Sequence, residues 1–182
     1  IPRVYGSSVL YGNVFWLENN KIKEVTIVHE YQSGKDETST YNTYEYYATF
    51  AVGLCEGPIS DIGKIWLGSN LIYDITSTDP LTAKETQKFT TKFTIYKGTD
   101  TQNPDSRMQS TLGVENTPAY RGLAYIIFND LPLKDYGNSL LGAQIKVEIV
   151  KGSRTPKLYP TTYNLTDTAY GEIYDNYTKF RH

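Results

Sequence analysis

The chain is poor in the residues that build most active sites and cross-links. It has one cysteine, two histidines and one methionine in 182 residues. A single cysteine excludes a disulfide within the chain, and no pair of Cys or His residues has the spacing of a zinc site. Cys55 lies in an apolar run, so we expect it to be a buried small hydrophobe. His29 lies within a predicted strand, where a structural or surface role is expected rather than a catalytic one.

Neither the charge nor the apolar runs indicate a nucleic acid or a membrane as partner. The 18 basic and 20 acidic residues are mixed along the chain, without the basic stripe that nucleic-acid binding requires. No apolar run approaches the roughly 18 residues of a membrane-spanning helix. The sequence has no glycine-rich phosphate loop, and its carboxylates cannot be paired by spacing alone. We therefore expect no enzyme activity, cofactor, metal or sequence-specific binding of nucleic acid.

Tyrosine is the residue that the chain has in abundance, with 17 copies. A tyrosine ring covers apolar surface and keeps a hydroxyl for water or a partner. A predicted strand over residues 40–54 is polar at its start, apolar at its end, and carries four of them: Tyr41, Tyr44, Tyr46 and Tyr47. Together with Trp66 they are the candidate partner-contact residues, because exposed aromatic rows bind proteins or sugars. The alternative is cross-strand packing in a solvated sheet.

The hydrophobic pattern predicts a mainly β, β-rich α+β fold with mixed or antiparallel sheets or a barrel-like closure. Residues 124–128 are apolar on both faces, which is typical of a strand buried on both sides. In residues 22–31 the odd-numbered positions form the more apolar face, which predicts a half-buried strand. The other expected strands are 9–17, with a hairpin turn or bulge at Gly12, a hairpin of 64–67 and 70–75, and the segments 92–97 and 144–150.

Turn residues and one helix signal divide these strands. Pro58 ends the strand 40–54, and Gly122 precedes the buried strand. The Arg121 guanidinium is expected to bind carbonyls or a carboxylate at that strand's start, with surface exposure as the alternative. A short helix is predicted near 104–112, with Asn103 as its cap. Pro58, Asn103, Arg121 and Gly122 are thus the candidate structural residues.

The composition changes after Val150. Residues 151–156 resemble a linker, and the rest has little core material, apart from helical spacing of apolar residues over 166–180. We expect one β-rich domain over residues 1–150, and a linker and extension toward a neighbouring domain or subunit over 151–182. The chain starts with Ile rather than Met, so we expect it to be a fragment of a longer protein.

Three segments in a fixed order carry a resemblance to a known family. The first joins IPRVYG at residues 1–6 to GNVFW at 12–16. The second is YATFAVGLCEGPI at 47–59, continued through Ile65-Trp66 and LIYD at 71–74. The third joins YKGTDTQNPD at 96–105 to PAYRGLAY at 118–125 and LPL at 131–133. Over residues 1–150 the chain resembles the phage tail protein family, the tail-tip or baseplate-hub proteins of long-tailed phages, prophages and gene transfer agents. The loop 137–143 departs from the family pattern.

This resemblance implies a structural hub component in a virion tail, made in the bacterial host cytoplasm and assembled as a homotrimer. Its implied partners are other tail proteins, namely the tube or adaptor ring, the tape measure and fibre domains, together with a glycan or protein of the host surface. Two other functions stay open at this point. One is a carbohydrate- or receptor-binding β-module, indicated by the tyrosine cluster, and the other is a hydrolase of cell-wall glycan.

Overall fold

The computed structural model describes residues 1–32, 34, 37–75, 77, 92–140 and 144–152. Their fold is mainly β, with antiparallel strands in two sheets. The first sheet has the order β1-β9-β5-β6, formed by β1 (Gly6–Tyr11), β9 (Ile145–Lys151), β5 (Asp61–Leu67) and β6 (Asn70–Asp74). Gly68, with a φ of 57°, turns the chain between β5 and β6, as the sequence predicts.

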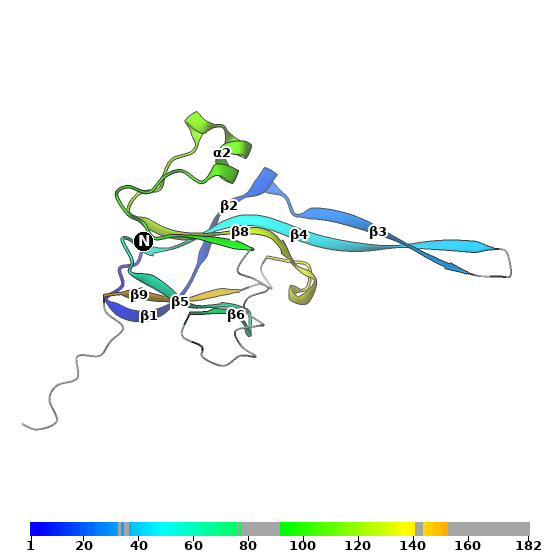
Figure 1. The fold of residues 1–182 in the computed structure, drawn as a ribbon, viewed down its shortest axis with the longest axis horizontal. Helices are drawn as coiled ribbons and strands as arrows, with labels where there is room; N and C mark the ends of the chain where they lie inside the picture. Colours follow the sequence, from blue (N-terminus) through cyan, green and yellow to red (C-terminus); the bar gives the residue numbers. More distant parts are fainter. Residues whose placement is uncertain (33, 35–36, 76, 78–91, 141–143, 153–182) are drawn as a thin grey trace, which may run out of the picture.

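The second sheet contains the longest strand and the projecting part of the molecule. Its order is β2-β4-β8-β7, and β3 pairs with β4 beside that path. The strands are β2 (Asn13–Leu17), β3 (Lys23–Gln32), β4 (Thr38–Glu56), β7 (Phe93–Tyr96) and β8 (Leu123–Pro132). Figure 1 shows the two sheets stacked, with neither closed into the barrel that the sequence left open.

The main core lies between the two sheets. The second sheet contributes Phe50, Val52, Ile126 and Phe128, and the first contributes Ile62, Ile65, Val147 and Ile149 among others. A smaller cluster on the outer face of the second sheet joins Ala51, Tyr125 and Ile127 to Met108 of the helix. The strand over 124–128 is therefore buried on both sides, as its two apolar faces predict.

The predicted hairpin or bulge at Gly12 is wrong, because the strands on either side of this residue belong to different sheets. The Gly12 N–H donates to the carbonyl oxygen of Ile145 at 3.0 Å. A Cβ at this position would lie 2.2 Å from Val52 Cγ1. Glycine therefore lets the chain pass close over β4 as it moves from one sheet to the other.

The helix is α2 (Ser106–Leu112), and its cap is Asp105 rather than the predicted Asn103. Asp105 has extended backbone angles, and its carboxylate accepts hydrogen bonds from the N–H groups of Arg107 and Met108 at 2.8 and 2.9 Å. Asn103 is two residues too early to reach them. The predicted end at Gly113 is confirmed, since its φ is 91°.

Short turns of 3-10 helix complete the described structure: η1 (Glu18–Asn20), η2 (Val114–Asn116) and η3 (Lys134–Tyr136). Strand β8 continues past Asn129, where the sequence predicts its end, because a register shift and a left-handed residue, Asp130, keep it paired with β4. The helical spacing over 166–180 and almost all of the extension predicted for 151–182 lie outside the described residues. Within the described part, no helix is long and apolar enough to cross a membrane.

Candidate functional site

The most prominent surface feature is an arm, formed by β3 and residues 38–46 of β4. Figure 1 shows it projecting from the two-sheet body. Ten cross-strand pairs hold it together, from Lys23 opposite Tyr47 to Gln32 opposite Thr38. The second half of β4 pairs with β2 and β8 and is buried in the body. Strand β4 therefore anchors the arm, because its second half is buried in the core of the body and its first half forms part of the arm.

One face of the arm carries an aromatic cluster. The ring of His29 stacks on Tyr41 with 4.8 Å between centroids, and Tyr31 lies 6.0 Å from the same ring. His29 Nε2 also hydrogen-bonds Thr43 Oγ1 at 2.7 Å. Val25 and Ile27 are half-buried on this face, which confirms the predicted apolar side of the strand. His29 is therefore a packing residue, and Tyr31 and Tyr41 each remain about half exposed.

The opposite face is acidic and carries the two most exposed large hydrophobic residues of the arm. Val28 is 59% exposed and Tyr44 is 53% exposed, so both offer contact area to a partner. Tyr46 lies nearer the body and packs against the main core. Its hydroxyl hydrogen-bonds Glu24, its cross-strand neighbour, and this carboxylate raises the pKa of Tyr46. Glu30 adds a second negative charge farther along this face.

The four predicted tyrosines thus lie together on the arm, with different exposure. Tyr41 and Tyr44 are exposed, whereas Tyr46 and Tyr47 are half-buried near its base. The Tyr47 hydroxyl donates to Glu45 Oε2 at 2.5 Å. Trp66 is not part of this group, because it lies on β5 in the other sheet with Lys146 Nζ 4.8 Å from its ring centroid. Partner contact by these five residues stays a prediction.

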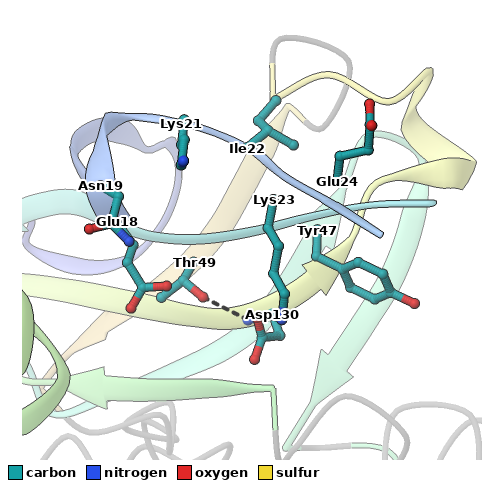
Figure 2. Close-up of a pocket in the computed structure, with 9 residues that line it drawn as sticks. All are labelled: Glu18, Asn19, Lys21, Ile22, Lys23, Glu24, Tyr47, Thr49 and Asp130. Atoms are coloured by element: carbon teal, nitrogen blue, oxygen red, sulfur yellow. Dashed lines mark hydrogen bonds and ion pairs between the residues drawn. The ribbon is translucent and has the colours of Figure 1, made fainter. Parts of the chain in front are cut away.

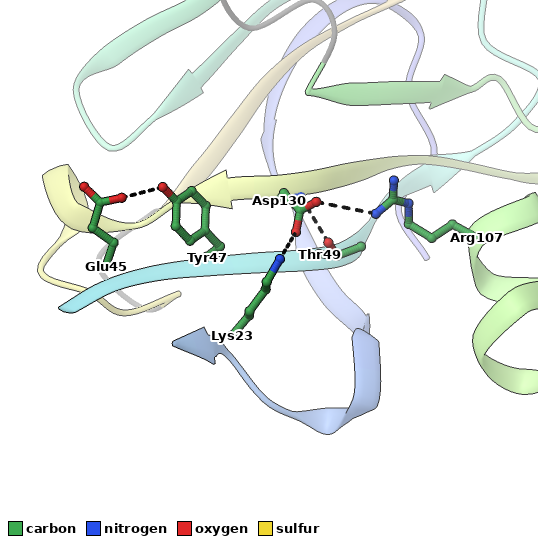
Figure 3. A network of polar contacts seen from close by, with 6 residues as sticks. All are labelled: Lys23, Glu45, Tyr47, Thr49, Arg107 and Asp130. Carbon is green, nitrogen blue, oxygen red and sulfur yellow. Dashed lines mark hydrogen bonds and ion pairs between the residues drawn. The ribbon is translucent and has the colours of Figure 1, made fainter. Parts of the chain in front are cut away.

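Asp130 connects the base of the arm to the rest of the molecule, as Figure 3 shows. Its backbone N–H donates to Thr49 Oγ1 on β4 at 3.0 Å. Its carboxylate lies 3.8 Å from Lys23 Nζ on β3 and 3.9 Å from Arg107 Nη1 on α2. Because these side chains are substantially exposed, each ion pair contributes at most about 1 kcal/mol. The arrangement orients the arm more than it stabilises the fold.

A polar pocket of about 360 Å³ lies at this junction (Figure 2). It combines three carboxylates with two ammonium groups, next to Thr49 and Tyr47. The charged lining residues are Glu18, Lys21, Lys23, Glu24 and Asp130. Mixed charges of this kind suit the polar side chains of a protein partner. The sequence does not indicate the site, because its lining residues come together only when β3 and β8 pair with β4.

An apolar hollow lies near the C-terminal end of β4, at the end of this strand that is farther from the arm. It has a volume of about 500 Å³ and is lined mainly by Ile1, Pro2, Phe15, Leu54, Tyr120 and Leu123. Among the described residues, no group of three or more His, Cys, Asp or Glu side chains is arranged to hold a metal ion. Cys55 is fully buried, and burial raises the pKa of its thiol.

The candidate structural residues lie at the predicted turns. Arg121 Nε donates to the carbonyl oxygen of Gln102 at 3.2 Å, although the residue is exposed. Gly122 has a φ of 79°, which favours glycine. Pro58 follows a cis peptide bond directly after β4. Gln102 was missed by the sequence reasoning: it is buried and accepts a hydrogen bond from the Gly98 N–H at 2.8 Å, which ties the loop before α2 to the sheet.

Comparison with known proteins gives one informative match. No family model matches the chain, and no curated protein sequence matches it significantly. The fold is similar to that of a chain in the solved structure of the virion of a native gene transfer agent particle, with a TM-score of 0.51 and 23% sequence identity. The alignment covers 95% of this chain and 34% of that chain. This protein therefore spans about a third of the virion chain and shares the fold of that part.

Proposed function

We propose that this protein is a structural component of a phage-like tail tip or baseplate hub, where it joins the tail tube to tip or fibre domains. The observation that carries the proposal is the fold shared with a gene transfer agent virion chain over 95% of the length. The ordered motifs of residues 1–133 support the same assignment, because they resemble those of tail-tip and hub proteins. Such a protein acts through its surfaces, without catalysis or cofactor.

The arm supports a role in assembly. An isolated two-stranded hairpin is marginally stable in water, and it gains stability when a third strand or another surface covers it. Here the hairpin projects from the body with Val28 and Tyr44 exposed. The polar pocket at its base adds charged groups of both signs. We assign the arm to contacts with other tail proteins, and we propose a homotrimer in the assembled tail.

The direct test is to find the protein in purified particles. Mass spectrometry of phage-like particles from the producing cell, followed by immunogold labelling in electron micrographs, gives its presence and its position. We expect the label at the distal end of the tail. Particles that lack the protein would refute the proposal, and a label on the head would refute the tail assignment.

Carbohydrate or receptor binding is the second candidate, favoured by the exposure of Tyr44, which lies diagonally across the strand pair from Glu24. An exposed aromatic ring next to a carboxylate is a common arrangement for contacting sugar rings. A glycan array would show binding that disappears in the Tyr44→Ala protein and persists in the Tyr5→Ala protein, whose tyrosine is 81% exposed but lies outside the arm. Equal binding by both variants would exclude the arm as the sugar site.

A further inference from the structure

We propose that the arms of neighbouring copies pair edge to edge, with β3 of one copy adding to the exposed edge of β4 in the next. This inference rests on the proposed function, because a tail component is present in several copies around an axis. The contact surface is the outer edge of the arm, and its occupant is a second copy of this chain. Four observations support this pairing.

The first observation is that the arm has two strand edges without a neighbour. In the part of the chain that the structure describes, β3 pairs with β4 alone along its whole length. Residues 40–45 of β4 pair with β3 on one side, whereas β8 begins to pair with β4 at Tyr47. The N–H and C=O groups on the outer edges therefore face away from the hairpin. Such edges are templates for strand addition.

The second observation is that neither edge is interrupted in its backbone. Native proteins block exposed edges with proline, bulges, very short strands or charged side chains, and of these the arm has only charged side chains, Lys23, Glu24 and Glu30 on β3 and Glu45 on β4. Residues 23–32 and 40–45 contain neither proline nor glycine. The pairing of β3 with β4 also runs through ten consecutive residue pairs without a register shift. A long, regular edge in a natural protein indicates that a partner strand covers it in the assembled state.

The third observation is that one register fits both chemistry and space. Opposite Pro132 and Leu133, β4 is already occupied by β8, so the first position open to a new strand lies near Glu45. If Lys23 of one copy lies opposite Glu45 of the next copy, this register also determines the five following residue pairs. They are Glu24–Tyr44, Val25–Thr43, Thr26–Asn42, Ile27–Tyr41 and Val28–Thr40. This register pairs opposite charges, places no like charges together and sets Ile27 against an aromatic ring.

The fourth observation concerns the two faces. In the proposed register every pair joins residues of the same face, so the aromatic face with His29 and Tyr41 continues from copy to copy. A slip by one residue would instead mix this face with the acidic face that carries Val28 and Tyr44. The alternation of side chains along the arm therefore excludes slips by one residue, and the charges select among the registers that remain.

Pairing of this kind has a consequence for the assembly. Each copy uses β3 on one side and β4 on the other, so the contact is head-to-tail and every added copy leaves one edge of each type. Such a heterologous contact closes into a ring when the rotation allows it. With three copies, a closed ring of arms would be one continuous antiparallel sheet of six strands.

Cysteine cross-linking in assembled particles tests the register. A chain with both Ile27→Cys and Tyr41→Cys places the two thiols opposite each other between copies, at Cα distances of about 4.5–5.5 Å that a disulfide can bridge. Within one arm the same residues are diagonal neighbours about 7–8 Å apart, which exceeds that reach. After mild oxidation, we expect a ladder of cross-linked dimers and trimers on a non-reducing gel, because three copies close the ring.

The control pair is Val28→Cys with Tyr41→Cys, which lie on opposite faces of the arm and should give no ladder. Val25→Cys with Thr43→Cys is a second pair in the proposed register, for use if the first variant does not assemble. Particles that contain the chain but show no ladder with either matched pair would overturn the arm pairing and leave the proposed function intact. A ladder of equal strength from the control would overturn it as well. Particles without the wild-type chain would overturn both proposals.

Discussion

Asp105 holds two separate parts of the molecule with one carboxylate. It caps α2 through the N–H groups of Arg107 and Met108, and its other oxygen accepts a hydrogen bond from the Tyr96 hydroxyl at 2.7 Å. Asp105→Ala removes the cap and leaves the hydroxyl of the half-buried Tyr96 without its acceptor. We expect the free energy of unfolding to fall by about 2–3 kcal/mol, measured by urea denaturation.

Asn103→Ala is the matched control for that prediction. Asn103 is the cap that sequence rules select, but it is exposed and lies before the first turn of the helix. Its removal should change stability by less than about 0.5 kcal/mol. A larger loss from Asn103→Ala than from Asp105→Ala would show that the helix begins earlier than the structure has it.

Two stacked tyrosines give a second prediction at the residue scale. The ring centroids of Tyr96 and Tyr125 lie 4.4 Å apart and the rings are nearly parallel, but the two hydroxyls have different hydrogen-bonding partners. The Tyr96 hydroxyl bonds Asp105, whereas that of Tyr125 is buried with no partner among the described residues. Tyr96→Phe should therefore cost about 1–2 kcal/mol, and Tyr125→Phe should leave the free energy of unfolding unchanged or slightly higher. Equal losses from both changes would contradict this difference.

The same pair makes stability depend on alkaline pH. Burial raises the pKa of both hydroxyls above the usual tyrosine value of 10.0, because a buried phenolate is poorly solvated. The folded protein therefore keeps these protons at a pH where the unfolded chain loses them. Their contribution is complete below pH 10 and falls as the pH rises above it. In the double variant Tyr96→Phe with Tyr125→Phe, the melting temperature should therefore fall less steeply between pH 9 and 11 than in the wild-type protein.

At the scale of elements, the arm and the buried strand β8 should differ most in local stability. The arm has one strand pair and little core contact, whereas residues 124–128 are buried on both sides. We expect amides of β3 to exchange with deuterium roughly 100-fold faster than those of residues 124–128, because the arm opens without unfolding the body. Hydrogen exchange read by mass spectrometry measures both segments in one experiment. Equal protection would mean that the arm is packed in the free protein.

The elements that local pattern specifies were predictable from the sequence. The strand over 124–128, the half-buried face of β3 and the β5–β6 hairpin follow from hydrophobic period and turn residues, which act over a few positions. Gly12 could not be interpreted correctly, because its role depends on Val52, forty residues away. The role of Asp130 could not be predicted for the same reason, since its partners Lys23, Thr49 and Arg107 come together only in the folded protein.

At the scale of the whole molecule, the arm and the apolar hollow lie toward opposite ends of β4. The hollow is lined by Leu54 and Leu123, whereas the arm contains the residues of β4 that precede Tyr47 in the sequence. One long strand thus carries two surfaces of different chemistry, one apolar and concave, the other a projecting tyrosine-rich hairpin. A protein with two such ends can contact two neighbours at once, as the joining role proposed above requires.

The division of the chain at residue 150 yields the last prediction. Every buried hydrophobic residue of the described structure lies between Val4 and Val150, and the Gly152 N–H is the last described group that contacts the body, through Ser60 Oγ at 2.8 Å. A protein of residues 1–152 should therefore unfold cooperatively, with a free energy within about 1 kcal/mol of the full chain. Urea denaturation of the two proteins side by side measures the difference. A loss of several kcal/mol would show that residues 153–182 complete the core, and that the domain does not end at residue 150.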